Sequence, residues 1–159
     1  MMGEQELLDI IRVQFALDWD GIHGPRHWTR VRENGLRLAD ATGANREVVA
    51  LFALLHDSRR LSDGRDPEHG RRAAEFARSL LGIAFHLDPD DLELLVTACR
   101  YHSDGLLDGD ITLLTCWDAD RLDLGRVGIT PRARYLCTEA ARDPAMLDWA
   151  YRRSMGWDG

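Results

Sequence analysis

Histidine and aspartate side chains at a few positions are the groups in this chain best suited to chemistry. The sequence of 159 residues contains six histidines, and one of them, His56, is followed directly by Asp57 at the end of a long apolar run. Burying an imidazole and a carboxylate there without partners is costly. A metal cation removes that cost because it binds a ring nitrogen and a carboxylate oxygen together. A lone His-Asp pair could also be a hydrogen-bonded dyad that caps the helix, so the metal hypothesis needs further ligands.

Both members of the doublet can serve one metal only if the helix ends there. Successive residues of a regular helix diverge by about 100°, and the polar loop that begins at Ser58 supplies the ending. Two more candidate ligands accompany the doublet. His27 lies near the start of the preceding predicted helix, and Asp120 lies in an acidic stretch inside an otherwise apolar helix.

The order of these residues resembles the HD superfamily. The first histidine is followed by Arg30 and Val31, and the distal aspartate stands in the string Ala-Asp-Arg-Leu. The resemblance covers roughly residues 26–128. It implies an all-helical fold, hydrolysis of phosphate esters of nucleotides, and a divalent metal bound by His27, His56, Asp57 and Asp120.

The distal ligand is less certain from the residues themselves, because Asp118 and Asp123 lie in the same acidic stretch. The match to Ala-Asp-Arg-Leu favours Asp120. Residues two apart project on different sides of a helix, so Asp118 or Asp123 could instead support a ligand or be solvated.

His69 and His102 extend the resemblance. Family members with histidines at both places often bind a second metal, so one or two ions are expected, with Asp57 as the bridge and as a catalytic residue. Imidazole and carboxylate ligands without thiolate favour Mn²⁺, Fe²⁺, Co²⁺, Ni²⁺ or Zn²⁺. Each of the two could instead be an ordinary polar residue at a helix end, and His23 and His86 are predicted not to be ligands.

Arginines near the doublet are candidates for binding phosphate. Arg59 and Arg60 follow Asp57 closely, and Arg72 lies one turn beyond His69. A guanidinium can bind phosphate oxygens through paired hydrogen bonds. We predict a catalytic role and substrate binding for Arg59, and substrate binding alone for Arg60 and Arg72. Most arginines on loops are simply solvated.

Composition limits the class of protein. Hydrophobic residues make up 45% and charged residues 30% of the chain, and the net charge is −7. An acidic surface disfavours a nucleic-acid polymer as partner but allows a local basic pocket for one small phosphorylated molecule. The longest apolar run, Val48–Leu55, is far shorter than the roughly 20 residues that cross a bilayer. No secretion signal is recognised, and three widely spaced cysteines are typical of reduced residues in a cytoplasmic protein.

Helical periodicity dominates the chain, so the sequence predicts one all-α domain over residues 1–159, a compact bundle of about six to eight helices. Gly43 is predicted to end one helix and Asn45 to cap the next. The expected helices cover residues 4–18, 26–41, 46–56, 67–81, 89–102 and 111–124, with a last pair within 131–141 and 144–155.

The predicted function is therefore a metal-dependent phosphohydrolase acting on a small phosphomonoester or nucleotide. The chain lacks the Gly-Tyr-Pro element of cyclic-dinucleotide members, which disfavours cyclic di-GMP as substrate. Alternatives remain: an HD-type diiron oxygenase, a catalytically silent module that binds metal or nucleotide, and a purely structural helical protein.

Overall fold

The computed structural model describes residues 3–157 and confirms the all-α prediction. Apart from an isolated bridge between Leu81 and Phe85, these residues form no β structure. The α-helices are α1 (Glu4–Gln14), α2 (Pro25–Thr42), α3 (Arg46–Leu55), α4 (His69–Leu80), α5 (Pro89–Tyr101), α6 (Ile111–Arg121), α7 (Glu139–Arg142) and α8 (Pro144–Ser154), with 3₁₀ turns η1 (Leu124–Val127) and η2 (Ala133–Tyr135) between α6 and α7.

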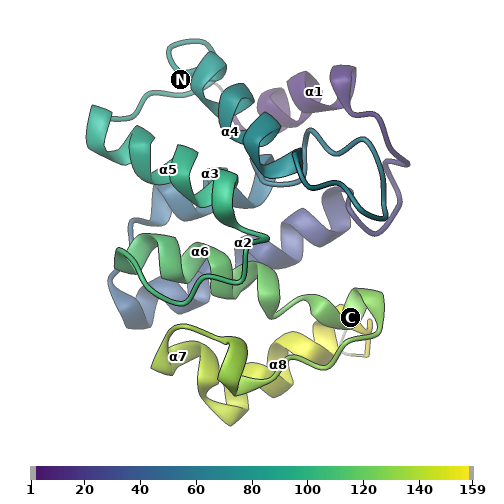
Figure 1. Cartoon of the computed structure of the whole chain (residues 1–159), viewed down its shortest axis with the longest axis vertical. Coiled ribbons are helices and arrows are strands. Elements are labelled where there is room, and N and C mark those ends of the chain that lie inside the picture. The colour runs from purple at the N-terminus through teal and green to yellow at the C-terminus, as the bar shows by residue number, and fades with distance from the viewer. Residues whose placement is uncertain (1–2, 158–159) are drawn as a thin grey trace.

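Helix α3 forms the centre of the bundle. Its N-cap is Asn45, whose side-chain oxygen accepts hydrogen bonds from the backbone N–H groups of Glu47 and Val48 at 3.0 and 3.1 Å, as predicted. Its apolar side chains contact α2, α4, α5 and α6, and six of its residues are buried. Figure 1 shows α2, α3, α5 and α6 in the middle of the molecule, with α1 and α4 on one side and α7 and α8 on the other. A helix that is apolar all round therefore has partners on every side.

Close packing of α2 against α3 requires a small residue. A Cβ at Gly35 would lie 2.4 Å from Cγ1 of Val49, which is well inside van der Waals contact. Both Asn34 and Gly35 lie on the buried stripe of α2 with His27, Val31 and Leu38. The glycine at position 43 ends α2 with a φ of 78°, which is the left-handed cap that the sequence predicts.

Only the short helix α7 and the turn η2 stand where a helix is predicted within residues 131–141. Thr138 has an extended backbone and caps only the short helix α7, through a hydrogen bond from the backbone N–H of Ala141. The backbone N–H groups of Cys137 and Thr138 donate instead to the carboxylate of Asp118 on α6, at 2.7 and 2.8 Å. Tertiary hydrogen bonds to α6 therefore replace the intrahelical bonds that a helix would need.

Helices α1, α4 and α6 are also shorter than predicted, and α4 begins only at His69, after Pro67. Helix α1 ends at Gln14 because Phe15 is extended, and the rings of Phe15 and Trp19 pack edge-on against the buried ring of Trp28. Helix α6 ends at Arg121, and the chain continues into the 3₁₀ turn η1. No helix within the described range is both long and apolar enough to cross a membrane.

Candidate metal centre and active site

The doublet and its two predicted partners converge on one point. The Nε2 atoms of His27 and His56 lie 3.0 Å apart. Oδ2 of Asp57 lies 3.2 Å from Nε2 of His27 and 3.4 Å from Nε2 of His56. Oδ1 of Asp120 lies 3.2 Å from Nε2 of His27 and 3.3 Å from Nε2 of His56. Donors bound at about 2.1 Å to one ion are about 3.0 Å apart at right angles and about 3.4 Å apart at tetrahedral angles. The observed separations match this range, so the four side chains could hold one metal ion.

A second set of donors shares Asp57. The Nε2 atoms of His69 and His102 lie 2.9 Å apart, and they lie 3.6 and 3.5 Å from Oδ1 of Asp57. Asp57 therefore directs one oxygen at each pair of histidines. The described residues contain two groups that could hold a metal, His27–His56–Asp57 and Asp57–His69–His102. A carboxylate that faces two donor sets is suited to bridge two ions about 3.5–4 Å apart.

Helix ends position these side chains. His27 lies in the first turn of α2, and His69 is the first residue of α4. His56 and His102 are the C-cap residues of α3 and α5. Because the backbone turns away at a helix end, neighbouring residues there can face one point. The predicted end of the helix at the His-Asp doublet is confirmed.

Hydrogen bonds on the far side of each ring fix its tautomer. The Nδ1 atom of His56 lies 3.0 Å from the carbonyl oxygen of Ala53, that of His69 lies 2.6 Å from Asp66, and that of His102 lies 2.6 Å from Cys99. A carbonyl oxygen can only accept, so each of these Nδ1 atoms carries the proton. The Nε2 atoms consequently face the carboxylates and can give their lone pairs to a metal, which is the arrangement that metal-binding histidines adopt.

Asp123 binds Nδ1 of His27 and so fixes the tautomer and orientation of that ring. Its Oδ2 atom lies 2.7 Å from Nδ1 of His27, and its Oδ1 atom accepts a hydrogen bond from Arg30 at 2.7 Å. Asp118 faces elsewhere, since its carboxylate accepts hydrogen bonds from the backbone at Cys137 and from both backbone and hydroxyl of Thr138. Of the three acids in this stretch, only Asp120 lies among the Nε2 atoms.

The imidazoles and carboxylates of the cluster strongly shift one another's pKa values. Burial acts to lower the pKa of His56, but the carboxylates of Asp57 and Asp120 outweigh it and raise this pKa to about 10. Burial would raise the pKa of either carboxyl group, yet the neighbouring imidazoles hold both well below the usual range. Oδ1 of Asp120 is buried and has no hydrogen-bond partner among the described residues. A divalent cation would take the place of the imidazole protons between these carboxylates and give Oδ1 of Asp120 a partner, so the residues present fit a metal.

Comparison with known proteins supports this reading of the fold. No protein-family model matches the chain, and no curated protein matches it significantly. Its structure is similar to the crystal structure of a predicted HD superfamily hydrolase from an uncultured Thermotogales bacterium, with a TM-score of 0.72 and 29% sequence identity. The similarity covers 98% of this chain and 89% of that one. The chain has the HD-domain fold.

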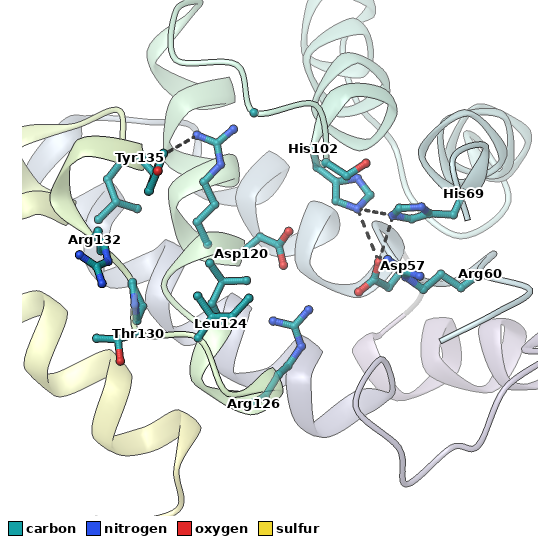
Figure 2. Close-up of a pocket in the computed structure, with 16 residues that line it drawn as sticks. Asp57, Arg60, His69, His102, Asp120, Leu124, Arg126, Thr130, Arg132 and Tyr135 are labelled. Carbon is teal, nitrogen blue, oxygen red and sulfur yellow. Dashed lines mark hydrogen bonds and ion pairs between the residues drawn. The ribbon is translucent and has the colours of Figure 1, made fainter. Parts of the chain in front are cut away.

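The HD-domain cluster opens onto a cavity of about 410 Å³. Asp57, His69, His102 and Asp120 line one part of it, and the segment between η1 and α7 lines another (Figure 2). This volume is in the range that small-molecule sites occupy. The charged lining consists of four arginines and two aspartates, Arg60, Arg121, Arg126, Arg132, Asp57 and Asp120. A chain of net charge −7 thus has a locally basic cavity, and both of its acids are among the candidate metal ligands.

The structure corrects the arginine predictions. Arg59 does not line the cavity, because its guanidinium donates to the side chain of Gln14 at 2.9 Å and lies over the ring of Phe76. Arg72 is likewise outside the cavity and bonds Asp66 at 2.5 Å. Of the three candidates only Arg60 lines it, and its Nε donates to Oδ1 of Asp57 at 3.2 Å.

Sequence reasoning missed Arg126, which faces the metal cluster from η1. Figure 2 shows its side chain directed at the space between Asp57 and Asp120. Its guanidinium donates to the backbone carbonyls of Ile22 and Asp123. Burial and this positive charge both act to lower the pKa of His27, although the carboxylates around that ring raise it overall. No local motif marks Arg126, since only the turn after α6 brings it to the cluster.

The remaining histidines lie outside the cluster. His23 is buried in the loop before α2, and its Nδ1 atom lies 2.7 Å from Oδ1 of Asp63. His86 is exposed. Neither belongs to a candidate metal group within residues 3–157.

Proposed function

We propose that this HD-domain protein is a metal-dependent phosphohydrolase that acts on a small phosphomonoester or a nucleotide. One observation carries the proposal: Asp57 lies between two imidazole pairs, and it opens with Asp120, His69 and His102 onto a cavity with an excess of arginine. The similarity to a predicted HD superfamily hydrolase is consistent with it.

The chain would hold the metal through His27, His56, Asp57 and Asp120, with His69 and His102 serving a second ion. A divalent ion in this site would supply Lewis acidity and lower the pKa of a coordinated water toward neutrality. Each histidine keeps its Nε2 lone pair available because its Nδ1 proton is bonded elsewhere.

Two arginines are placed to bind the phosphoryl group. Arg60 is held against Asp57 by its Nε, and the side chain of Arg126 extends from η1 toward the space between Asp57 and Asp120 (Figure 2). Arg126 makes no ion pair with any residue in the described part of the chain, and its guanidinium bonds only backbone carbonyls there. Guanidinium groups at these positions would offset the negative charge that gathers on the equatorial oxygens during phosphoryl transfer.

Phosphate release across a panel of divalent metals tests the proposal. Wild type should release phosphate from phosphomonoesters or nucleotides with at least one of Mn²⁺, Fe²⁺, Co²⁺, Ni²⁺ and Zn²⁺. Asp57→Ala should release none, because it removes the carboxylate that faces both donor sets, while its circular dichroism spectrum stays helical. Inactivity of wild type with every metal and nucleotide would contradict the proposal, and equal activity of the variant would show that the site is misplaced.

The second imidazole pair also supports an alternative, an HD-type diiron oxygenase. His69, His102 and Asp57 provide the additional ligands that such chemistry needs. Iron content together with oxygen consumption would identify the oxygenase, whereas metal-dependent phosphate release without oxygen consumption would identify the hydrolase. Tight nucleotide binding with neither activity would identify a silent binding module.

A further inference from the structure

The cavity has a second basic end, away from the metal cluster. Figure 2 shows His69 and His102 at one end, and Arg132, Thr130 and Tyr135 at the other. All five side chains line the same cavity. A ligand bound at the metal end could therefore extend to the other end without leaving the cavity.

The guanidinium of Arg121 contributes to this second end and has only neutral partners. It donates to the carbonyl oxygens of Leu106 and Tyr135 at 2.7 and 3.2 Å, and to Sγ of Cys137 at 3.3 Å. These bonds join the loop after α5 to the segment before α7 and hold the guanidinium in place. Its positive charge has no carboxylate partner within residues 3–157, in contrast to the exposed Arg78, which pairs with Glu93 at 2.8 Å.

Arg132 is the other positive group at this end. It is exposed, and its side chain makes no hydrogen bond or ion pair with any described residue, yet it lines the cavity. An arginine that is free to move and borders a cavity can bind an anion without first breaking another bond.

Apolar side chains line the cavity as well. Leu124 lies between the two ends in Figure 2, and Ile129, Pro131 and Leu136 from the chain after η1 add to the apolar lining. Such a wall offers no hydrogen bonds to a charged group, so it favours a less polar part of the ligand.

We propose that Arg121 and Arg132 form a second anion-binding subsite, so that the substrate carries two anionic groups joined by a less polar segment. The proposal rests on the proposed function, because the first anionic group is the phosphoryl group beside Asp57. Arg121 approaches the second group from the wall, and Arg132 approaches it from the mouth. This subsite makes Arg132 a determinant of specificity, and a simple phosphomonoester without a second charge is a poor substrate.

Calorimetry with Mn²⁺-saturated protein and non-hydrolysable ligands tests the subsite without requiring turnover. The ligands are alkyl phosphonates with a terminal carboxylate, in a graded series of chain lengths, each paired with its uncharged carboxamide. Wild type should bind the carboxylate of at least one length about tenfold more tightly than the matching carboxamide, as expected for a charge-assisted hydrogen bond. Arg132→Gln should reduce this preference to about twofold or less.

Arg142→Gln is the matched control. Arg142 is exposed on α7, lies outside the cavity, and makes no side-chain hydrogen bond or ion pair within the described residues, so its loss changes the net charge equally and should leave the preference intact. Three results would each overturn the subsite. Wild type could bind carboxylate and carboxamide equally at every chain length, Arg132→Gln could keep the wild-type preference for the carboxylate, or Arg142→Gln could lose that preference as fully as Arg132→Gln. A preference for the carboxylate without phosphate release from any phosphomonoester would refute the phosphohydrolase and keep the subsite. Phosphate release without a preference for the carboxylate would keep the phosphohydrolase and refute the subsite.

Discussion

The substitution Gly70→Ala should abolish metal binding by the second donor set, Asp57, His69 and His102. The first donor set, which contains His27 and His56, should keep its metal. Gly70 follows His69 in the first turn of α4, where this helix crosses α5. A Cβ at this position would lie 2.4 Å from the carbonyl oxygen of Arg100 and 2.9 Å from that of Cys99. Ordinary contacts of a Cβ begin at about 3.4 Å, so the two helices must separate by about 1 Å.

This separation acts directly on the second donor set. His69 moves with α4, whereas His102 is held to α5 through the carbonyl oxygen of Cys99. The gap between the two Nε2 atoms, 2.9 Å in the structure, would widen toward about 4 Å, while metal–ligand distances tolerate only about 0.2 Å. Overpacking of this kind costs about 1–3 kcal/mol of stability. The first donor set comes from α2, α3 and α6 and should keep its metal.

The assay is metal content per chain after equilibrium dialysis, with calorimetry to resolve one or two binding phases. Wild type should bind two ions and Gly70→Ala one, at a lower melting temperature. Gly64→Ala is the control, because its Cβ would meet only the Ser62 hydroxyl at 3.6 Å. Two ions bound by Gly70→Ala with unchanged affinities would refute the reasoning, and a single ion in wild type would show that His69 and His102 do not hold a metal.

Three further outcomes are expected. Asp123→Asn should weaken metal binding by about 10- to 100-fold in calorimetry, because it removes the charge that orients His27; an unchanged affinity would contradict that role. Arg126→Gln should lower kcat/KM for a phosphomonoester by about 10²-fold, whereas Arg59→Gln should have a much smaller effect, and the reverse order would favour the prediction from sequence. In metal-free protein the pKa of His56 is raised from 6.5 to about 10, so its contribution to stability is complete below pH 6.5 and is lost as the pH rises through 10. The melting temperature followed by circular dichroism should therefore fall over this interval, and a flat profile would be inconsistent with the cluster.

Most of the helices could be predicted from the sequence because their signals are local. The glycine at position 43 determines where α2 ends and the Asn45 cap determines where α3 begins, and neither signal depends on a distant residue. The segment between α6 and α7 could not be predicted this way. Its backbone N–H groups bond to Asp118, which lies about twenty residues away in the chain, and so its conformation depends on where α6 packs.

The candidate site divides in the same way. Its histidines and aspartates could be named from residue type, from their place at helix ends and from the resemblance to the HD superfamily. The directions of the three acids of α6 and the turn after it are visible only in the structure, because three carboxylates within six residues differ in direction and not in chemistry. Asp120 faces the Nε2 atoms, Asp118 faces the backbone before α7, and Asp123 faces Nδ1 of His27.

The arginines show where sequence reasoning fails for a physical reason. Proximity in the chain favoured Arg59, but a side chain one or two residues from a ligand can point to either side of the backbone, and its guanidinium binds Gln14. Arg126 and Arg132 lie far from the doublet in sequence and line the cavity only because the chain after α6 folds back over it. The sequence by itself determined most of the helices and the candidate metal ligands, whereas the tertiary structure decided which positive charges line the cavity.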